Sequence, residues 1–324
     1  MVETPRITKL FENSRTVCIG RFLIDVPADA QVVYGPSEVP YPVKVYRGKA
    51  NEMEGMIAER LAQIQKEKPD VYGALRGKDS MVGKVINGLA PGQKIVFGVS
   101  SASFAFYNIE SYVKVDDDIV MQNAEASGSP EKYSTVVLEL NSMAPLFRSR
   151  SDLQIPAETG VCIEDGFVKD AGKSSFEMVG LGIRLTSYPD VHFSLSLTNK
   201  DILVPSDALE PRIGQAEQIA RSSGQGAWHE RIKNLRRGRR EIGRWVGYEV
   251  LARMPAQEAA GESHEFAFLS QGEPKNPYLP VLELELHSGM RENQIGGKKP
   301  SVTDDEAVAI WDRLTSSIRL RPHL

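Results

Sequence analysis

The sequence predicts an α+β protein of two similar domains, each a mainly antiparallel sheet flanked by helices. First, the chain has 324 residues, more than one hydrophobic core usually fills. Second, strand-like and helix-like segments follow one another in the same order in both halves. Third, the stretch TVCIGRFLIDVP (16–27) has a relative in TGVCIEDGFVKD (159–170), and these stretches contain the only two cysteines, Cys18 and Cys162.

The first half alternates strands with two helices. Residues 51–67 predict a helix, because apolar residues recur there at helical spacing. A second helix begins at Pro130, with Ser129 as its N-cap. Asp116 to Asp118 suit a hairpin turn. β-Branched and aromatic residues bounded by Pro and Gly predict strands within 17–27, 41–48, 93–101, 103–108 and 111–125.

The second half repeats this order. Residues 176–199 predict a hairpin that turns at Pro189-Asp190. A helix is expected from near Asp207, with a break at SSGQG (222–226) and a short continuation to about Arg236. Strands follow at 243–255, 264–270 and 280–289, and in the last of these Leu282, Leu284 and Leu286 face inward. The closing helix starts with a capping-box pattern from Thr303 to Glu306.

Both halves end in a helix followed by an arginine-containing tail, LFRSR at 146–150 and IRLRP at 318–322. The polar segment 149–160 between them reads as a linker. We therefore predict an N-terminal α+β domain over 1–150 and a C-terminal α+β domain over 151–324, related by internal duplication. The alternative is that two α+β domains share an element order by chance.

Composition excludes several classes of protein. Hydrophobic residues make up 41% and charged residues 25%, as in ordinary soluble globular proteins. The net charge of −4 gives no global attraction to nucleic acid or anionic lipid. No apolar run is long enough for a membrane-spanning helix, so no direct membrane insertion is expected. Residues 1–16 contain no apolar stretch typical of a signal peptide.

The motifs of enzyme active sites are not matched. Between Gly166 and Gly172 lie five residues, whereas a phosphate-binding loop needs four before Gly-Lys. No G-x-S-x-G motif occurs, and the histidines are not at metal-ligand spacing. Glu283, Glu285 and His287 share one strand face, which suits either a carboxylate site or ordinary solubility, and we favour solubility. We predict no catalytic, cofactor-binding or metal site, and no cofactor.

The sequence ERIKNLRRGRREIGR (230–244) is strongly basic. A nucleic-acid site would also need aromatic platforms, and the flanking Trp228 and Trp245 are expected to pack instead. The run is therefore read as a solvated turn or as a patch that meets an acidic protein partner. Under the second reading the candidate partner-binding residues are Arg231, Arg236, Arg237, Arg239 and Arg240.

Three motifs in order resemble one family. They are C-x-G-R-F-L-I-D-V-P from Cys18, C-I-E-D-G-F-V from Cys162, and W-D-R-L-x-x-S-I-R-L-R-P from Trp311 to Pro322. Together they resemble the immunity proteins that protect bacteria from type VI secretion lipase effectors, the fourth class of the Tle/Tli phospholipase–immunity pairs. The resemblance spans nearly the whole chain.

This resemblance implies a non-enzymatic protein that binds and inhibits a cognate phospholipase as a 1:1 heterodimer. It implies that the two domains clamp the effector and block its activation at the membrane. It also implies a periplasmic location, with the export signal removed or outside this chain; the alternative location is the cytoplasm. Two other functions stay open: a cell-envelope binding or scaffold protein with another partner, and an enzyme with an unrecognised site.

The resemblance also bears on the two cysteines. In an oxidising periplasm, Cys18 and Cys162 form a possible disulfide between the two repeats. The competing reading is that both are buried thiols that act as small hydrophobic residues.

Overall fold

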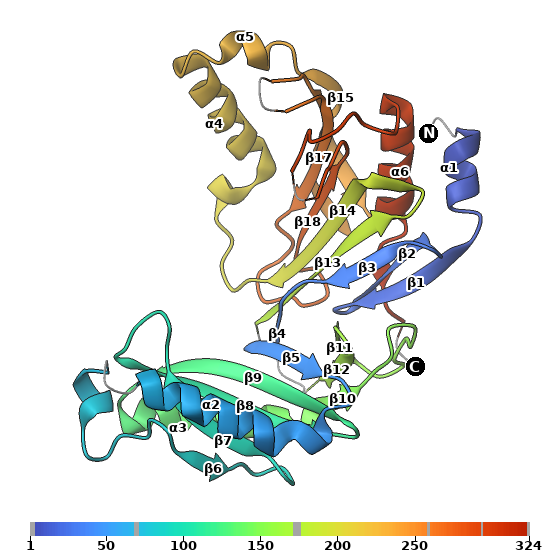
Figure 1. Ribbon diagram of the computed structural model, residues 1–324. Coiled ribbons are helices and arrows are strands. Elements are labelled where there is room, and N and C mark those ends of the chain that lie inside the picture. Colours follow the sequence, from blue (N-terminus) through green and yellow to red (C-terminus); the bar gives the residue numbers. More distant parts are fainter. Residues whose placement is uncertain (1–3, 68–70, 171–175, 258–259, 293, 323–324) are drawn as a thin grey trace. The chain divides into compact units, whose positions relative to one another are not determined.

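The structure is a computed structural model that describes residues 4–67, 71–170, 176–257, 260–292 and 294–322 (Figure 1). Its contacts divide the chain into two compact units. The larger unit consists of Met1–Gly35 and Ser174–Leu324, and the smaller unit of Pro36–Lys173. No helix of the described residues is both long and apolar enough to cross a membrane.

An antiparallel sheet forms the larger unit, with strand order β15-β16-β17-β18-β14-β13 and with β3 paired to β13. Its strands are β3 (Gln31–Tyr34), β13 (Glu177–Leu185), β14 (Tyr188–Asn199), β15 (Lys233–Ile242), β16 (Trp245–Met254), β17 (Ser263–Ser270) and β18 (Val281–His287). In β18, Leu282, Leu284 and Leu286 are buried while the residues between them are partly exposed, which confirms the predicted alternation.

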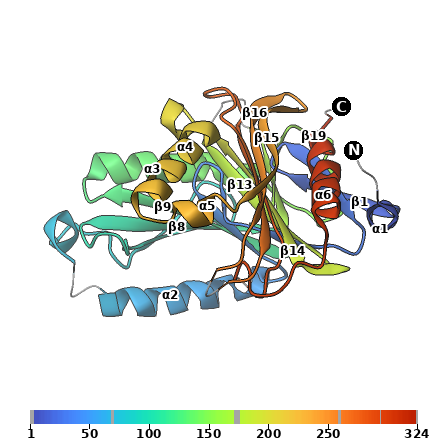
Figure 2. The same cartoon turned by 90° about the horizontal axis from the view of Figure 1, so that it is seen from above.

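Helix α6 (Asp304–Ser316) covers one face of this sheet. Its Trp311 ring lies 5.9 Å from the Phe193 ring and 6.0 Å from the Phe266 ring, measured between centroids. The predicted capping box is confirmed: Thr303 accepts from the amide of Glu306, whose carboxylate accepts from the amide of Thr303. Figure 2 shows α4 (Leu209–Ser222) and α5 (Gly226–His229) on the opposite side of the sheet from α6. Helix α1 (Pro5–Leu10) precedes the first strand.

The smaller unit contains antiparallel sheet strands in the order β4-β5-β9-β8-β7-β6. Helices α2 and α3 lie on opposite sides of it (Figure 2). Arg60 of α2 donates to Glu110 at 2.7 Å on one face, and the Tyr133 ring of α3 lies 5.6 Å from that of Tyr107 on the other. The elements are β4 (Ser37–Glu38), β5 (Pro42–Tyr46), α2 (Met53–Glu67), β6 (Val85–Asn87), β7 (Lys94–Val99), β8 (Phe106–Val115), β9 (Asp118–Ser127) and α3 (Pro130–Met143). Both predicted helices are confirmed, as is the turn, where Asp116 has a φ of 51°.

Each unit also contains a small three-stranded sheet built on a hairpin. In the larger unit, β1 (Ser14–Ile19) and β2 (Phe22–Pro27) form the hairpin, and β19 (Arg319–Leu320) pairs with β2. In the smaller unit, β11 (Gly160–Ile163) and β12 (Gly166–Lys169) form the hairpin, and β10 (Phe147–Ser149) pairs with β12. The opening strands of both halves are thus completed by a strand that follows a helix.

These small sheets explain why the contacts divide the chain differently from the predicted boundary at residue 150. The hairpin of the first half pairs with the tail of the second half, and the hairpin of the second half pairs with the tail of the first half. The first half of the sequence therefore contributes its opening hairpin to the larger unit, and the second half contributes its opening hairpin to the smaller unit. The fold class, two α+β parts with antiparallel sheets flanked by helices, is confirmed. The internal duplication stays a prediction. It is supported by the corresponding pairing of hairpin and tail in the two units.

The basic run differs from its predicted local structure. Instead of a helix reaching Arg236 and a solvated turn, α5 ends at His229 and residues 233–242 form strand β15. A strand places alternate side chains on opposite faces, and this lets part of the run meet carboxylates of the core face while the rest stays in water.

The turn predicted at Pro189-Asp190 was wrong. The hairpin between β13 and β14 turns at residues 186–187, and both Pro189 and Asp190 belong to β14. Pro189 is tolerated because the register with β13 shifts between Arg184 and Leu185, which leaves it outside the paired ladder. Asp190 is fully buried, and its Oδ2 accepts from the amides of Gly289 and Ser301, each at 3.0 Å.

Candidate functional site

The candidate partner-binding arginines lie on or beside β15, the end strand of the larger sheet. Arg236 and Arg240 point toward α6, and Arg237 and Arg239 point to the opposite face, as the strand alternation requires. Arg231 lies just before the strand and is exposed. The structure thus brings four of the five residues onto one strand but divides them between its two faces.

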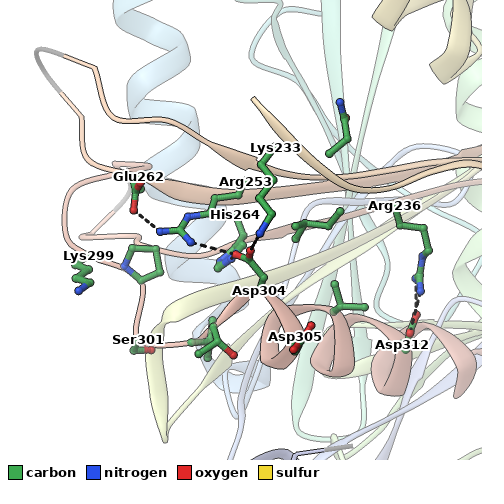
Figure 3. Close-up of a pocket in the computed structure, with 16 residues that line it drawn as sticks. Lys233, Arg236, Arg253, Glu262, His264, Lys299, Ser301, Asp304, Asp305 and Asp312 are labelled. Carbon is green, nitrogen blue, oxygen red and sulfur yellow. Dashed lines mark hydrogen bonds and ion pairs between the residues drawn. The ribbon is translucent and has the colours of Figure 1, made fainter. Parts of the chain in front are cut away.

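The two inward arginines form an ion cluster with two buried carboxylates. Arg236 donates to Glu249 at 2.5 Å and to Asp312 of α6 at 2.6 Å (Figure 3). Arg240 donates to Glu249 as well and forms an ion pair with Asp312 at 2.9 Å. Trp311 Nε1 also donates to Glu249, at 2.7 Å. Burial acts to lower the pKa of Arg236, but its hydrogen bonds to Asp312 and Glu249 outweigh burial and raise it. This cluster ties α6 to the sheet.

The outward arginines face water and α4. Arg237 donates to Tyr248 Oη at 3.2 Å and to Glu217 of α4 at 2.7 Å, and these hydrogen bonds raise its pKa. Arg239 is exposed, and within the described residues neither Arg239 nor Arg231 forms an ion pair. Arg231 and Arg239 are therefore the two of the five predicted residues that remain available to a partner.

A cavity of about 850 Å³ opens at the N-terminus of α6 (Figure 3). Lys233 and Arg253 reach into it and contact Asp304 at 2.6 and 3.4 Å. His264 also lines it, and His264 Nε2 lies 2.9 Å from Asp304 Oδ1. Burial acts to raise the pKa of Asp304, but hydrogen bonds from Lys233 and His264 outweigh it and lower the pKa.

A serine completes a chain of side chains that looks like a hydrolytic triad. Ser288 Oγ lies 2.6 Å from His264 Nδ1, and His264 in turn contacts Asp304. However, Ser288 is fully buried, and its oxygen already accepts from the backbone amide of His264 at 3.0 Å. A nucleophile must reach the substrate, so this hydroxyl is placed to hold strands and loop together. Burial is the main cause that lowers the pKa of His264, which favours the neutral ring.

The alternative enzyme residues on β18 lie on its partly exposed face. His287 Nε2 is 3.5 Å from Glu285 Oε2, and Glu283 pairs with Arg212 of α4 at 3.6 Å. The hydrogen bond from His287 lowers the pKa of Glu285, opposite to the raised pKa that a carboxylic general acid needs near neutral pH. Among the described residues, no group of three or more His, Cys, Asp or Glu side chains could hold a metal ion. Gly172, part of the rejected phosphate-loop reading, lies outside the described residues.

The two cysteines occupy equivalent places. Cys18 lies on β1 opposite Leu23 of β2, and Cys162 lies on β11 opposite Phe167 of β12. Both side chains are fully buried.

Sequence reasoning missed the carboxylates that hold the inward arginines. Glu249 and Asp312 were not singled out, although a signal existed for both. Glu249 has the same strand phase as the apolar Trp245 and Leu251, and Asp312 follows Trp311 within the apolar stripe of the last helix. A charged residue at a core position needs a partner of opposite charge, and the arginines of the basic run at 230–244 were the obvious candidates.

Comparison with known proteins identifies the family. A family model described as the Tle cognate immunity protein 4 N-terminal domain matches residues 15–143, and one for the C-terminal domain of the same protein matches residues 154–323. A search of curated proteins found no match.

Solved structures share the fold across nearly the whole chain. The apo structure of immunity protein TplEi of T6SS from Pseudomonas aeruginosa is similar with a TM-score of 0.74 and 22% identity, over 96% of this chain and 98% of that one. A crystal structure of a Tle4-Tli4 complex contains a chain similar with a TM-score of 0.75 and 23% identity, over 97% and 99%. With both of its domain models matched in order, this chain belongs to the Tle cognate immunity protein 4 family.

Proposed function

We propose that this protein binds a cognate phospholipase effector of a type VI secretion system as a 1:1 heterodimer and inhibits it. The two domains clamp the effector and block its activation at the membrane. The observation that carries the proposal is the match of both immunity-protein domain models over 15–143 and 154–323. A solved complex named for a Tle4 and a Tli4 protein, whose fold this chain shares, supports a direct protein partner.

The site chemistry supports a binding role without catalysis. Ser288, whose hydroxyl contacts His264, is buried and already hydrogen-bonded. The exposed arginines on and beside β15 are instead suited to contact with a partner protein. Inhibition by surface binding needs only shape and charge complementarity.

The proposal predicts tight inhibition at one equivalent. Protection requires the capture of scarce enzyme molecules, so a Kd of about 1 nM or below is expected, which is roughly −12 kcal/mol. The test mixes the purified protein with the phospholipase encoded beside it and measures hydrolysis of micellar phospholipid, with an unrelated secreted lipase as control. We expect loss of activity at a 1:1 ratio for the cognate enzyme only. A complex that keeps full activity on micelles would contradict the clamp, and the absence of a complex would contradict binding.

We further propose that the protein acts in the periplasm and that Cys18 and Cys162 form a disulfide there. The equivalent positions of the two cysteines support this, and neither is a free thiol in the structure. In the chain-entropy model a bridge over so long a loop stabilises by about 4–5 kcal/mol. Thiol titration of the unreduced protein in denaturant is expected to find no reactive thiol. Two reactive thiols would show that the cysteines are unbridged.

A further inference from the structure

Strand β15 has one edge that no other strand of the described residues covers. It is the end strand of the larger unit's sheet and pairs only with β16 among the described strands. It is ten residues long, and its pairing with β16 is continuous from Arg236 to Ile242, beyond the register shift between Asn234 and Arg236. An uncovered edge presents backbone N–H and C=O groups that another extended chain can bond.

The pairing register shows which residues present these groups. Gly243, with a φ of 56°, and Arg244 form the two-residue turn that joins β15 to β16. In such a hairpin the residues flanking the turn, here Ile242 and Trp245, form a hydrogen-bonded pair, and bonded and non-bonded pairs alternate from there. Residues at non-bonded positions point their backbone groups away from β16, and these are Arg237, Arg239 and Glu241.

The charge along this edge is strongly positive and only partly compensated. Lys233 and Arg237 are paired with Asp304 and Glu217. Arg231, Arg239 and Arg244 are exposed and have no ion pair within the described residues. An acidic extended segment would therefore gain charge-assisted contacts along the same edge that supplies the backbone bonds.

These arginines also select against the wrong partner. Positive charge on an edge strand repels the same edge of a second copy of this chain, which is the usual protection against aggregation. The same charge attracts an acidic strand, so one feature provides both repulsion of copies and specificity for a partner.

We propose that the open edge of β15 receives an extended acidic segment of the effector as an additional strand. The inference rests on the proposed function, because the effector is the partner. It names a mode of contact, backbone pairing at Arg237, Arg239 and Glu241, that the proposed function does not require.

The test separates backbone pairing from side-chain charge at one position. Arg239→Pro removes both the outward N–H and the charge, whereas Arg239→Ala removes only the charge. Proline is tolerated at an edge position whose N–H points outward, and the preceding Gly238 accommodates it. Thermal melting of both variants checks that the fold is kept. With the phospholipase encoded beside the protein, we expect Arg239→Pro to raise Kd by about 50-fold or more and Arg239→Ala by less than about tenfold.

Residue-resolved hydrogen exchange gives an independent measurement that remains informative if the proline variant misfolds. In the complex, the amides of Arg237, Arg239 and Glu241 are expected to gain protection, because they become bonded to the added strand. Equal binding by wild type, Arg239→Pro and Arg239→Ala would overturn the inference, as would equal losses in the two variants or unprotected amides in the complex. If the wild-type protein fails to bind the phospholipase at all, the proposed function fails instead.

Discussion

A fragment of residues 36–173 is expected to fold alone, whereas fragments cut at the predicted boundary, 1–150 and 151–324, are expected not to. The reason is the exchange of hairpins. Fragment 1–150 contains β1 and β2 without β19 and without the sheet of the larger unit, and it contains β10 without β12. Buried residues of the first hairpin, among them Ile19, Phe22 and Ile24, would then face water.

The expected effect of the cut is comparable to the stability of an ordinary domain. Losing one buried side chain of this kind removes about 1.5–3 kcal/mol, and the larger unit in fragment 151–324 lacks Val17, Ile19, Phe22, Ile24 and Val26 of the first hairpin, all nearly or fully buried. The sum approaches the roughly 5–15 kcal/mol that separates a folded domain from its unfolded chain. Fragment 36–173, in contrast, keeps its sheet, α2, α3 and the complete small sheet β10-β12-β11.

Circular dichroism and thermal melting of the three fragments under reducing conditions test this expectation. Mixing 1–150 with 151–324 serves as the control, since the exchanged hairpins can then find their strands and native melting is expected to return. A cooperative melt of 1–150 alone would show that the exchange of hairpins is not needed for folding.

The sequence predicts local features of this fold well because their causes are local. The capping box of Thr303 and Glu306 acts within one helical turn, and Ser129 and Pro130 take the N-cap and first positions of α3, although the Ser129 side chain makes no capping hydrogen bond. The alternation in β18 is likewise visible within the strand itself. The partner of each small strand is not local. No local feature of LFRSR (146–150) indicates that Phe147 pairs with Val168 rather than with the first hairpin.

The candidate site shows the same contrast between local features, which the sequence predicts, and distant partners, which it does not. Charge density identifies the run at 230–244, but the face on which each arginine lies depends on the exact strand phase. The register with β16 shifts between Asn234 and Arg236, so alternation cannot be counted from the start of the run. The carboxylates that take up Arg236 and Arg240 lie on β16 and α6, and Asp312 is 76 residues from Arg236 in sequence. The sequence therefore predicts that a basic surface exists, and the structure divides it into inward and outward arginines.

Replacing Glu249 is expected to destabilise the larger unit by about 2–4 kcal/mol. Glu249 is 1% exposed and accepts from Arg236, Arg240 and the indole of Trp311. Removing one partner of a buried ion pair typically loses about 3–5 kcal/mol, because the opposite charge stays buried without compensation. Part of that loss is relieved here, since the Arg236 side chain is 38% exposed and Asp312 still pairs with both arginines.

The comparison that isolates this effect uses two glutamates of one hairpin. Glu249→Ala is expected to lower the melting temperature by about 5–15 °C, and Glu241→Ala, on the exposed face of β15, by less than about 2 °C. Glu249→Gln keeps the shape and can still accept from Trp311 but loses the charge, so an intermediate loss is expected if the ion cluster matters more than the space that the side chain fills. If Glu249→Gln matches wild type, the cluster contributes little, and α6 is held to the sheet mainly by the packing of Trp311 between Phe193 and Phe266.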